Sequence, residues 1–108
     1  MKKYTDIKKN DTDALKSAVN LRVVSVAIQA DNIMSYSSGV FDDPNCGTQL
    51  DHGVSVVGFG TAAGTDYWIV RNSWGVNWGE QGYIRMKIIP GTGPGECGIN
   101  MAASYPVV

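Results

Sequence analysis

The stretch HGVSVVGFGTAAGTDYWIVRNS, at residues 52–73, decides the fold of this chain. Its two apolar runs, at 52–60 and 66–73, are rich in valine, isoleucine and aromatic residues, which favour β-strands. The glycine, alanine and threonine residues at 60–65 predict a turn, so the two strands are expected to form a hairpin. Both strands are apolar over most of their length, which is typical of strands covered on both faces.

The segments on either side of this hairpin predict further strands. Turn-rich segments separate them, and the last strand is predicted to be a short edge strand that ends at Pro106, because proline cannot donate a hydrogen bond within a sheet. These strands are expected at residues 4–9, 23–30, 82–89 and 102–106.

One helix is predicted at residues 10–21, where the sequence is NDTDALKSAVNL. Asn10 can cap this helix, and Asp13 lies in its first turn, where the helix dipole favours negative charge. Its apolar residues share one face: Leu15, Ala18 and Val19. One helix among closely spaced strands predicts an α+β fold, an antiparallel β-sheet or barrel with one packed helix. Residues 1–108 are expected to form a single domain.

The charge balance and the hydropathy of the chain argue against several classes of partner. Nine basic and ten acidic residues give a net charge of -1, so neither nucleic acid nor an anionic membrane is expected as a partner. No apolar run is long enough to predict a membrane span. The charged start MKKYTDIKKN has no apolar segment behind it, so no signal peptide is expected.

The two cysteines, Cys46 and Cys97, cannot complete a four-ligand zinc site with a single histidine, so no metal site is expected. A disulfide, a free pair and one reactive thiol all remain open, although the flanking glycines favour a bridge between two loops. A bridge would close a loop of about 50 residues, stabilise the fold by roughly 4 kcal/mol and indicate an oxidising compartment. Asn10 also begins a glycosylation sequon, a pattern that is common by chance.

His52 is the only histidine in the chain. A lone histidine is most often structural, but this one opens a strand beside Gly53, which leaves its side chain open to a cleft. If the hairpin strands pair antiparallel, residues 52 and 72 lie at the same end of the ladder. A histidine that acts as a general base needs a group that orients its second ring nitrogen, and the side-chain carbonyl of Asn72 could be that group.

Two tryptophans, Trp74 and Trp78, follow Asn72 closely. They could be core aromatic residues, but the glycines among and after them predict tight turns in which the rings fold back over the neighbouring backbone. An indole over a hydrogen bond between His52 and Asn72 would exclude water and strengthen that bond.

Three blocks of the sequence resemble the C-terminal, right-hand β-barrel-like half of the papain-like cysteine proteases, above all the cathepsin L-like branch. The blocks are LDHGVSVVGFG at 50–60, YWIVRNSWGVNWGEQGYIRM at 67–86 and CGINMAASYP at 97–106. They follow one another in the order that the family shows, and the resemblance covers the chain from about Val24 onward.

The resemblance implies a role for each matching residue. His52 matches the catalytic histidine, Asn72 the asparagine that orients it, Trp74 the tryptophan that shields the pair, and Trp78 the packing neighbour of Trp74. Cys46 and Cys97 match a structural disulfide. Five further residues match the pocket for the second substrate residue before the cut: Ala27, Leu50, Asp51, Gly53 and Ala102. With mostly small or apolar walls, that pocket is expected to accept a bulky apolar side chain such as leucine or phenylalanine.

The nucleophile of the family lies in a C-G-S/A-C-W block, which nothing in residues 1–108 matches. The oxyanion-hole glutamine belongs to the same half, and Gln29, Gln49 and Gln81 do not match it. The resemblance therefore implies a cysteine-type endopeptidase as the whole protein. This chain would supply the base, its orienting amide and part of the cleft, and it would be inactive alone because a complementary N-terminal half carries the cysteine.

Two other functions are compatible with the sequence. One alternative is a binding or self-associating module, because a bare apolar face favours a homodimer, a domain swap or binding of a complementary half. Another is a structural β-domain with an inert His52. The resemblance further implies peptide or protein substrates, cystatin-like inhibitors, no cofactor, and a lysosomal, vacuolar or secreted location.

Overall fold

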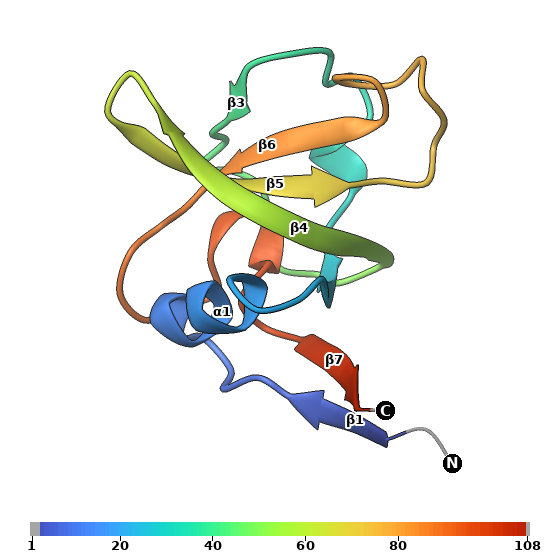
Figure 1. The fold of residues 1–108 in the computed structure, drawn as a ribbon. Coiled ribbons are helices and arrows are strands. Elements are labelled where there is room, and N and C mark those ends of the chain that lie inside the picture. The colour runs from blue at the N-terminus through green and yellow to red at the C-terminus, as the bar shows by residue number, and fades with distance from the viewer. Residues whose placement is uncertain (1–2, 108) are drawn as a thin grey trace.

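Seven strands form one mixed sheet in the computed structural model, which describes residues 3–107 (Figure 1). The order across the sheet is β1-β7-β2-β4-β5-β6-β3, and all neighbours are antiparallel except β3 and β6. The strands are β1 (Lys3–Asp6), β2 (Val24–Ile28), β3 (Val40–Phe41), β4 (His52–Ala62), β5 (Thr65–Arg71), β6 (Tyr83–Lys87) and β7 (Ala103–Val107). The order is linear, so the described sheet is unclosed, with β1 and β3 at its edges.

The predicted α+β fold, a largely antiparallel sheet with one packed helix, is confirmed. The parallel pairing of β3 with β6 was not expected, because a strand of two residues is too short to show an alternating pattern. The predicted edge position of the last strand is wrong. β7 lies between β1 and β2, because the first strand of the chain pairs with its outer side.

The central hairpin closes on a two-residue turn at Ala63 and Gly64, and Ala62 pairs with Thr65. Both turn residues have positive φ, 49° and 80°, as a type I′ hairpin turn requires. The positive φ of both residues gives the turn a twist that matches the right-handed twist of the flanking strands, so β4 and β5 pair directly from the turn outward.

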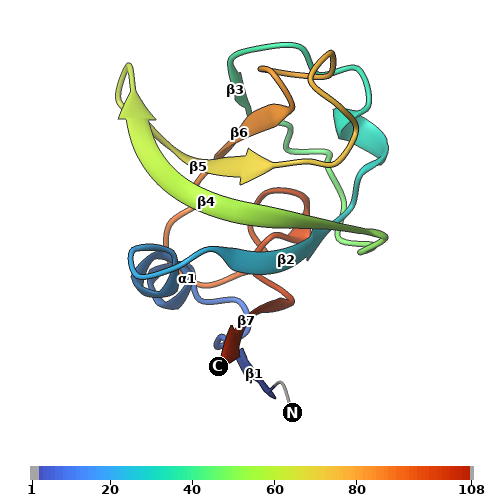
Figure 2. The ribbon, with the colours of Figure 1, turned by 45° about the vertical axis from the view of Figure 1, so that its right-hand side comes forward.

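Helix α1 (Thr12–Val19) packs against β4 and brings Leu15 and Val19 into the core (Figure 2). The predicted cap at Asn10 is wrong: Asp11 caps the helix, and its carboxylate accepts a hydrogen bond from the backbone N–H of Ala14 at 3.0 Å. Asn10 instead has φ 60° and ends the preceding turn, so its side chain does not occupy the capping position.

The prediction that both hairpin strands are covered on both faces is wrong. Burial alternates along β4: Val54 and Val56 are buried, whereas Phe59 is 40% exposed. In β5, Trp68 and Val70 are buried and their neighbours are not. The apolar core therefore lies on one face of the hairpin, as is usual for antiparallel sheets.

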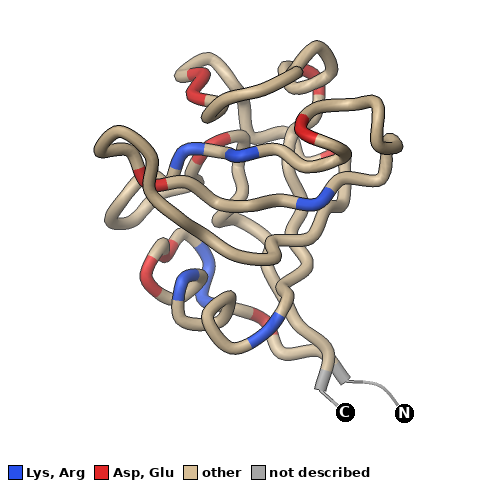
Figure 3. Tube along the Cα trace, turned by 45° about the horizontal axis from the view of Figure 1, so that its top comes forward, with Lys and Arg blue, Asp and Glu red and all other residues tan. Residues whose placement is uncertain are grey.

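Charged residues of both signs are interspersed around the described chain (Figure 3). The helices of residues 3–107 are all too short or too polar to cross a bilayer.

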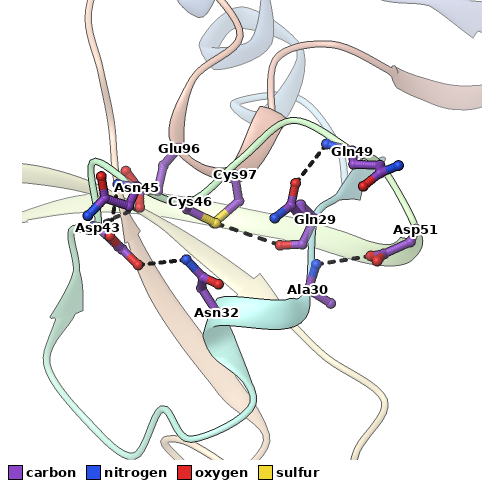
Figure 4. Close-up of a disulfide and its surroundings, with 10 residues drawn as sticks. All are labelled: Gln29, Ala30, Asn32, Asp43, Asn45, Cys46, Gln49, Asp51, Glu96 and Cys97. Carbon is purple, nitrogen blue, oxygen red and sulfur yellow. Dashed lines mark hydrogen bonds between the residues drawn. A yellow bond between two sulfur atoms is a disulfide. The ribbon is translucent and has the colours of Figure 1, made fainter.

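Cys46 and Cys97 form the expected disulfide, with their Cα atoms 4.9 Å apart (Figure 4). The bond joins the loop before β4 to a short 3-10 turn, η2 (Glu96–Gly98). Both sulfur atoms are used in this bond, so neither cysteine is a reactive thiol or a thiolate ligand in the structure.

Glu96 is a buried carboxyl group beside this disulfide, 3% exposed, and its Oε2 accepts a hydrogen bond from the backbone N–H of Asp43 at 2.8 Å. Burial raises the pKa of Glu96 to about 6; the charges of Asp42 and Asp43 add to the rise, whereas the hydrogen bond and Lys87 oppose it. Because this pKa is higher in the folded state than in the unfolded state, protonated Glu96 stabilises the fold. Its contribution to the free energy of unfolding is fully present below the ordinary pKa of a glutamate. That contribution is lost as pH rises through the folded-state value.

Replacing Glu96 with glutamine should make the free energy of unfolding less dependent on pH. Glutamine keeps an oxygen for the Asp43 N–H but carries no charge. We expect the free energy of unfolding of the unmodified chain to fall by roughly 1–2 kcal/mol between acidic and neutral pH because Glu96 loses its proton. Glu96→Gln should not show this fall. Urea unfolding followed by tryptophan fluorescence across pH measures this difference. The exposed control Asp31→Asn should behave like the unmodified chain, and an unchanged pH dependence in Glu96→Gln would contradict the assignment.

Candidate active site

The structure brings His52 and Asn72 together at one end of the central hairpin, with 2.7 Å between His52 Nε2 and Asn72 Oδ1. The backbone N–H of Ser73 donates to the same side-chain atom at 2.7 Å, which identifies that atom as the carbonyl oxygen. An oxygen can only accept here, so Nε2 carries the hydrogen. The neutral ring therefore keeps the lone pair of its other nitrogen, Nδ1, available for a proton.

A β-bulge places these two side chains on the same face. The pairing of β4 with β5 shifts by one residue between Val56 and Gly58, so that Val56 lies opposite Val70. Side chains alternate along each strand, so His52 points to the same face as Val56, and Asn72 to the same face as Val70. Without this shift, the register set at the turn would direct His52 to the other face.

Trp74 stacks on His52, with ring centroids 4.9 Å apart and an interplanar angle of 26°. Trp78 meets Trp74 edge-on, with centroids 5.2 Å apart, and its indole N–H donates to the backbone carbonyl of Ile33 at 3.2 Å. Trp78 is thus anchored to the segment after β2 and supports Trp74. This pair covers one side of the imidazole and shields its hydrogen bond from water.

The loop that carries both tryptophans is held at several points, of which the sequence predicts the glycine turns but not the ion pair of Glu80 with Arg85. The backbone N–H of Asn72 donates to the carbonyl of Gly82 at 3.0 Å. Gly79 has φ 59°, and an added Cβ would lie 2.6 Å from the carbonyl oxygen of Tyr83. Arg85 binds both carboxylate oxygens of Glu80 at 2.8 Å. The fork of Arg85 holds the pKa of Glu80 below its ordinary value, so this ion pair stays charged.

Three of the residues that match the substrate pocket are neighbours in the sheet. Ala27 lies opposite Gly53 in the β2–β4 pair, and its backbone N–H donates to the carbonyl of Ala102 at 3.2 Å. The same strand pair places Ile28 opposite His52. Gly53 follows His52 in the chain, and Ala27 lies in the adjacent strand opposite Gly53.

The other two, Leu50 and Asp51, precede His52. The backbone N–H of Asp51 donates to the carbonyl of Ile28, and its side-chain Oδ1 accepts a hydrogen bond from the backbone N–H of Ala30. Both distances are 3.0 Å. A hollow of about 310 Å³ beside Asn72 is lined by Gly53, and a separate hollow of about 370 Å³ by Ala102.

Known proteins match this chain over nearly its whole length. A family model described as papain family cysteine protease matches residues 1–107. The probable cysteine protease RD21B of Arabidopsis thaliana is 54% identical over 106 residues, 96% of this chain and 23% of that protein. The oryzain beta chain of Oryza sativa subsp. japonica is 53% identical over 105 residues, 95% of this chain and 22% of that protein. This chain thus spans less than a quarter of the length of either relative.

Solved structures show the same fold. The bromelain protease from Ananas comosus, in complex with the E64 inhibitor, has a TM-score of 0.92 at 42% identity. The match covers 97% of this chain and 49% of the bromelain chain. The digestive procathepsin L 3 of Tenebrio molitor larval midgut has a TM-score of 0.86 at 45% identity over 97% of this chain and 34% of its own. The chain therefore belongs to the papain family of cysteine proteases, and its sheet and helix correspond to the C-terminal half of their fold.

Proposed function

We propose that this chain supplies the general base, its orienting amide and one wall of the substrate cleft of a cysteine-type endopeptidase. The observation that carries the proposal is the 2.7 Å contact between His52 Nε2 and Asn72 Oδ1, because it leaves Nδ1 free to exchange a proton. Membership of a family of cysteine proteases supports the same chemistry. A complementary N-terminal half would supply the nucleophilic cysteine.

The reaction is acyl transfer in two steps. The thiolate attacks the carbonyl carbon of the peptide, a carbon–sulfur bond forms, and the carbon–nitrogen bond breaks while protonated His52 gives its Nδ1 proton to the leaving amine. Neutral His52 then takes a proton from a water molecule, which attacks the thioester and releases the carboxylic product and the thiolate. Asn72 orients the ring throughout, because Nε2–H donates to its oxygen in both charge states.

Residues Ala27, Leu50, Asp51, Gly53 and Ala102 are proposed as the pocket for the second substrate residue before the cut. The adjacency of Ala27, Gly53 and Ala102 supports a low wall beside His52. Such a wall leaves room for a leucine or phenylalanine side chain of the substrate. Cystatin-like proteins are proposed as inhibitors of the same cleft.

A vacuolar, lysosomal or secreted location is proposed. The disulfide between Cys46 and Cys97 supports an oxidising compartment during folding.

The test uses this chain alone and a fusion in which the N-terminal half of a similar plant cysteine protease precedes residue 1. The chain alone should hydrolyse no peptide, because it has no thiolate to attack, whereas the fusion should hydrolyse a fluorogenic peptide with leucine at the second position before the cut. The control is the same fusion with its nucleophilic cysteine replaced by alanine. Hydrolysis by the chain alone, or a folded fusion without activity, would end the proposal.

Self-association is a second candidate function, favoured by large apolar side chains that are exposed in this chain: Trp74 is 38%, Met34 68% and Val76 74% exposed. Sedimentation of the chain over a range of concentrations decides this candidate. A monomer at every concentration would exclude a homodimer or domain swap.

A further inference from the structure

Gln29 lies directly after β2 and contacts both sides of the disulfide (Figure 4). Its backbone N–H donates to the carbonyl of Cys97 at 2.9 Å, which ties it to η2. Its side-chain Oε1 accepts the backbone N–H of Gln49 at 2.8 Å, which ties it to the loop that leads into His52. Gln29 thus joins three segments that are far apart in the sequence.

The Gln49–Gln29 contact is the one hydrogen bond that the described structure gives to residues 47–50. The segment is fixed at one end by the disulfide at Cys46 and at the other by the two hydrogen bonds of Asp51. Between these ends, the amide oxygen of Gln29 makes the hydrogen bond that holds the backbone.

Gly47 shows how closely the Gln29 side chain lies against this segment. An added Cβ at Gly47 would collide with Oε1 of Gln29 and would lie 3.0 Å from its Cδ and Nε2. The φ of Gly47 does not require glycine, so the close approach of Gln29 is the reason that a larger residue does not fit there.

The segment carries Leu50, which packs on η2. A Cβ added at Gly98 would lie 2.8 Å from Leu50 Cδ2 and 3.2 Å from the sulfur of Met101. Leu50 is half-buried, so its place depends on the backbone that presents it. If residues 47–49 move, Leu50 loses its packing contact with Gly98.

We propose that Gln29 is a positioning residue, which holds the loop at 47–49 and thereby fixes Leu50 as a wall of the substrate pocket. We call the hydrogen bond between Gln29 Oε1 and the Gln49 N–H the clamp. The role of Leu50 in the pocket rests on the proposed function, whereas the clamp does not. Gln29 contacts no reacting atom and acts only through the loop.

The clamp is tested first in the chain alone. Gln29→Ala should raise the hydrogen-exchange rate of the Gln49 amide about tenfold and shift the methyl NMR signals of Leu50, because the acceptor is lost. Gln29→Glu keeps an acceptor oxygen and should leave the exchange rate close to that of the unmodified chain. An unchanged Gln49 amide in Gln29→Ala, or loss of protection in both variants, would overturn the proposal.

A second variant reaches the same clamp from the other side. Gly47→Ala should displace the Gln29 side chain and reproduce the faster exchange of Gln49. Gly58→Ala is the matched control, because an added Cβ there meets only Ile69, at 3.5 Å. Fast exchange in Gly58→Ala as well would show a general loosening of the sheet and would also overturn the proposal.

The effect on specificity is tested in the active fusion. Gln29→Ala should raise KM about fivefold to tenfold for a peptide with leucine at the second position before the cut, with little change in kcat, since a misplaced wall weakens binding of that side chain. Gln29→Glu should restore the original KM. A fusion without any activity speaks against the proposed function alone, since the exchange experiment still decides the clamp. An active fusion whose KM is unchanged in Gln29→Ala would refute the role of Leu50.

Discussion

Replacing His52 with alanine should lower kcat/KM of the active fusion by about 100- to 10,000-fold, the range that general acid–base catalysis contributes. The imidazole is the side chain of this site that can take and return a proton, since the contacts of Asn72 and Trp74 only orient and cover it. Added imidazole should restore part of the activity, whereas a purely structural histidine would not respond in this way.

The control for this experiment is Tyr4→Ala, on the far edge strand β1, which should leave hydrolysis close to that of the unmodified fusion. Tryptophan fluorescence and circular dichroism report whether each variant is folded. If His52→Ala is folded and keeps full activity, the histidine is inert and the structural alternative holds.

Asn72→Ala separates orientation from proton transfer in the same fusion. The variant removes the acceptor for His52 Nε2–H and leaves the backbone N–H of Ser73 without its partner. We expect kcat to fall by about 10- to 100-fold with KM nearly unchanged, because an oriented ring matters in the transition state more than in substrate binding. A change in KM alone would point to the cleft wall instead.

The meeting of His52 and Asn72 could be predicted from the sequence because local patterns determine it. Two β-rich runs, separated by a turn segment, place their outer ends side by side whatever the rest of the chain does. The face on which the two side chains lie could not be predicted. It depends on the bulge between Val56 and Gly58, and in the sequence a glycine in a strand is only a weak sign of a bulge.

Contacts between residues far apart in the sequence could not be predicted either. Gln29 and Gln49 are joined by one side-chain oxygen, and Glu96 lies 53 residues from Asp43. Neither contact leaves a periodic pattern, because each depends on how loops are brought together by the sheet and the disulfide. The same reason explains why the prediction of an edge position for the last strand was wrong. β7 pairs with β1, which lies at the other end of the chain.

Replacing both Cys46 and Cys97 with alanine should lower the free energy of unfolding of this chain by about 4 kcal/mol. The bond links residues that are 51 apart, so its loss lets the unfolded chain explore many more conformations. Cys97 is fully buried, and truncating it also removes packing in the core. Urea unfolding of the chain and of the double variant, followed by tryptophan fluorescence, measures the loss.

A reducing agent separates the bond from the packing. Reduction should destabilise the unmodified chain by a similar amount, whereas the double variant should not respond, because it has no bond to break. A small domain is typically stable by about 5–15 kcal/mol, so a loss of this size removes a large share of its stability. The bond also anchors the loop that carries Gln49, Leu50 and Asp51 into His52, so the variant should show faster exchange at Gln49 before it unfolds globally. A double variant with unchanged unfolding and unchanged exchange would mean that the sheet alone holds the histidine loop.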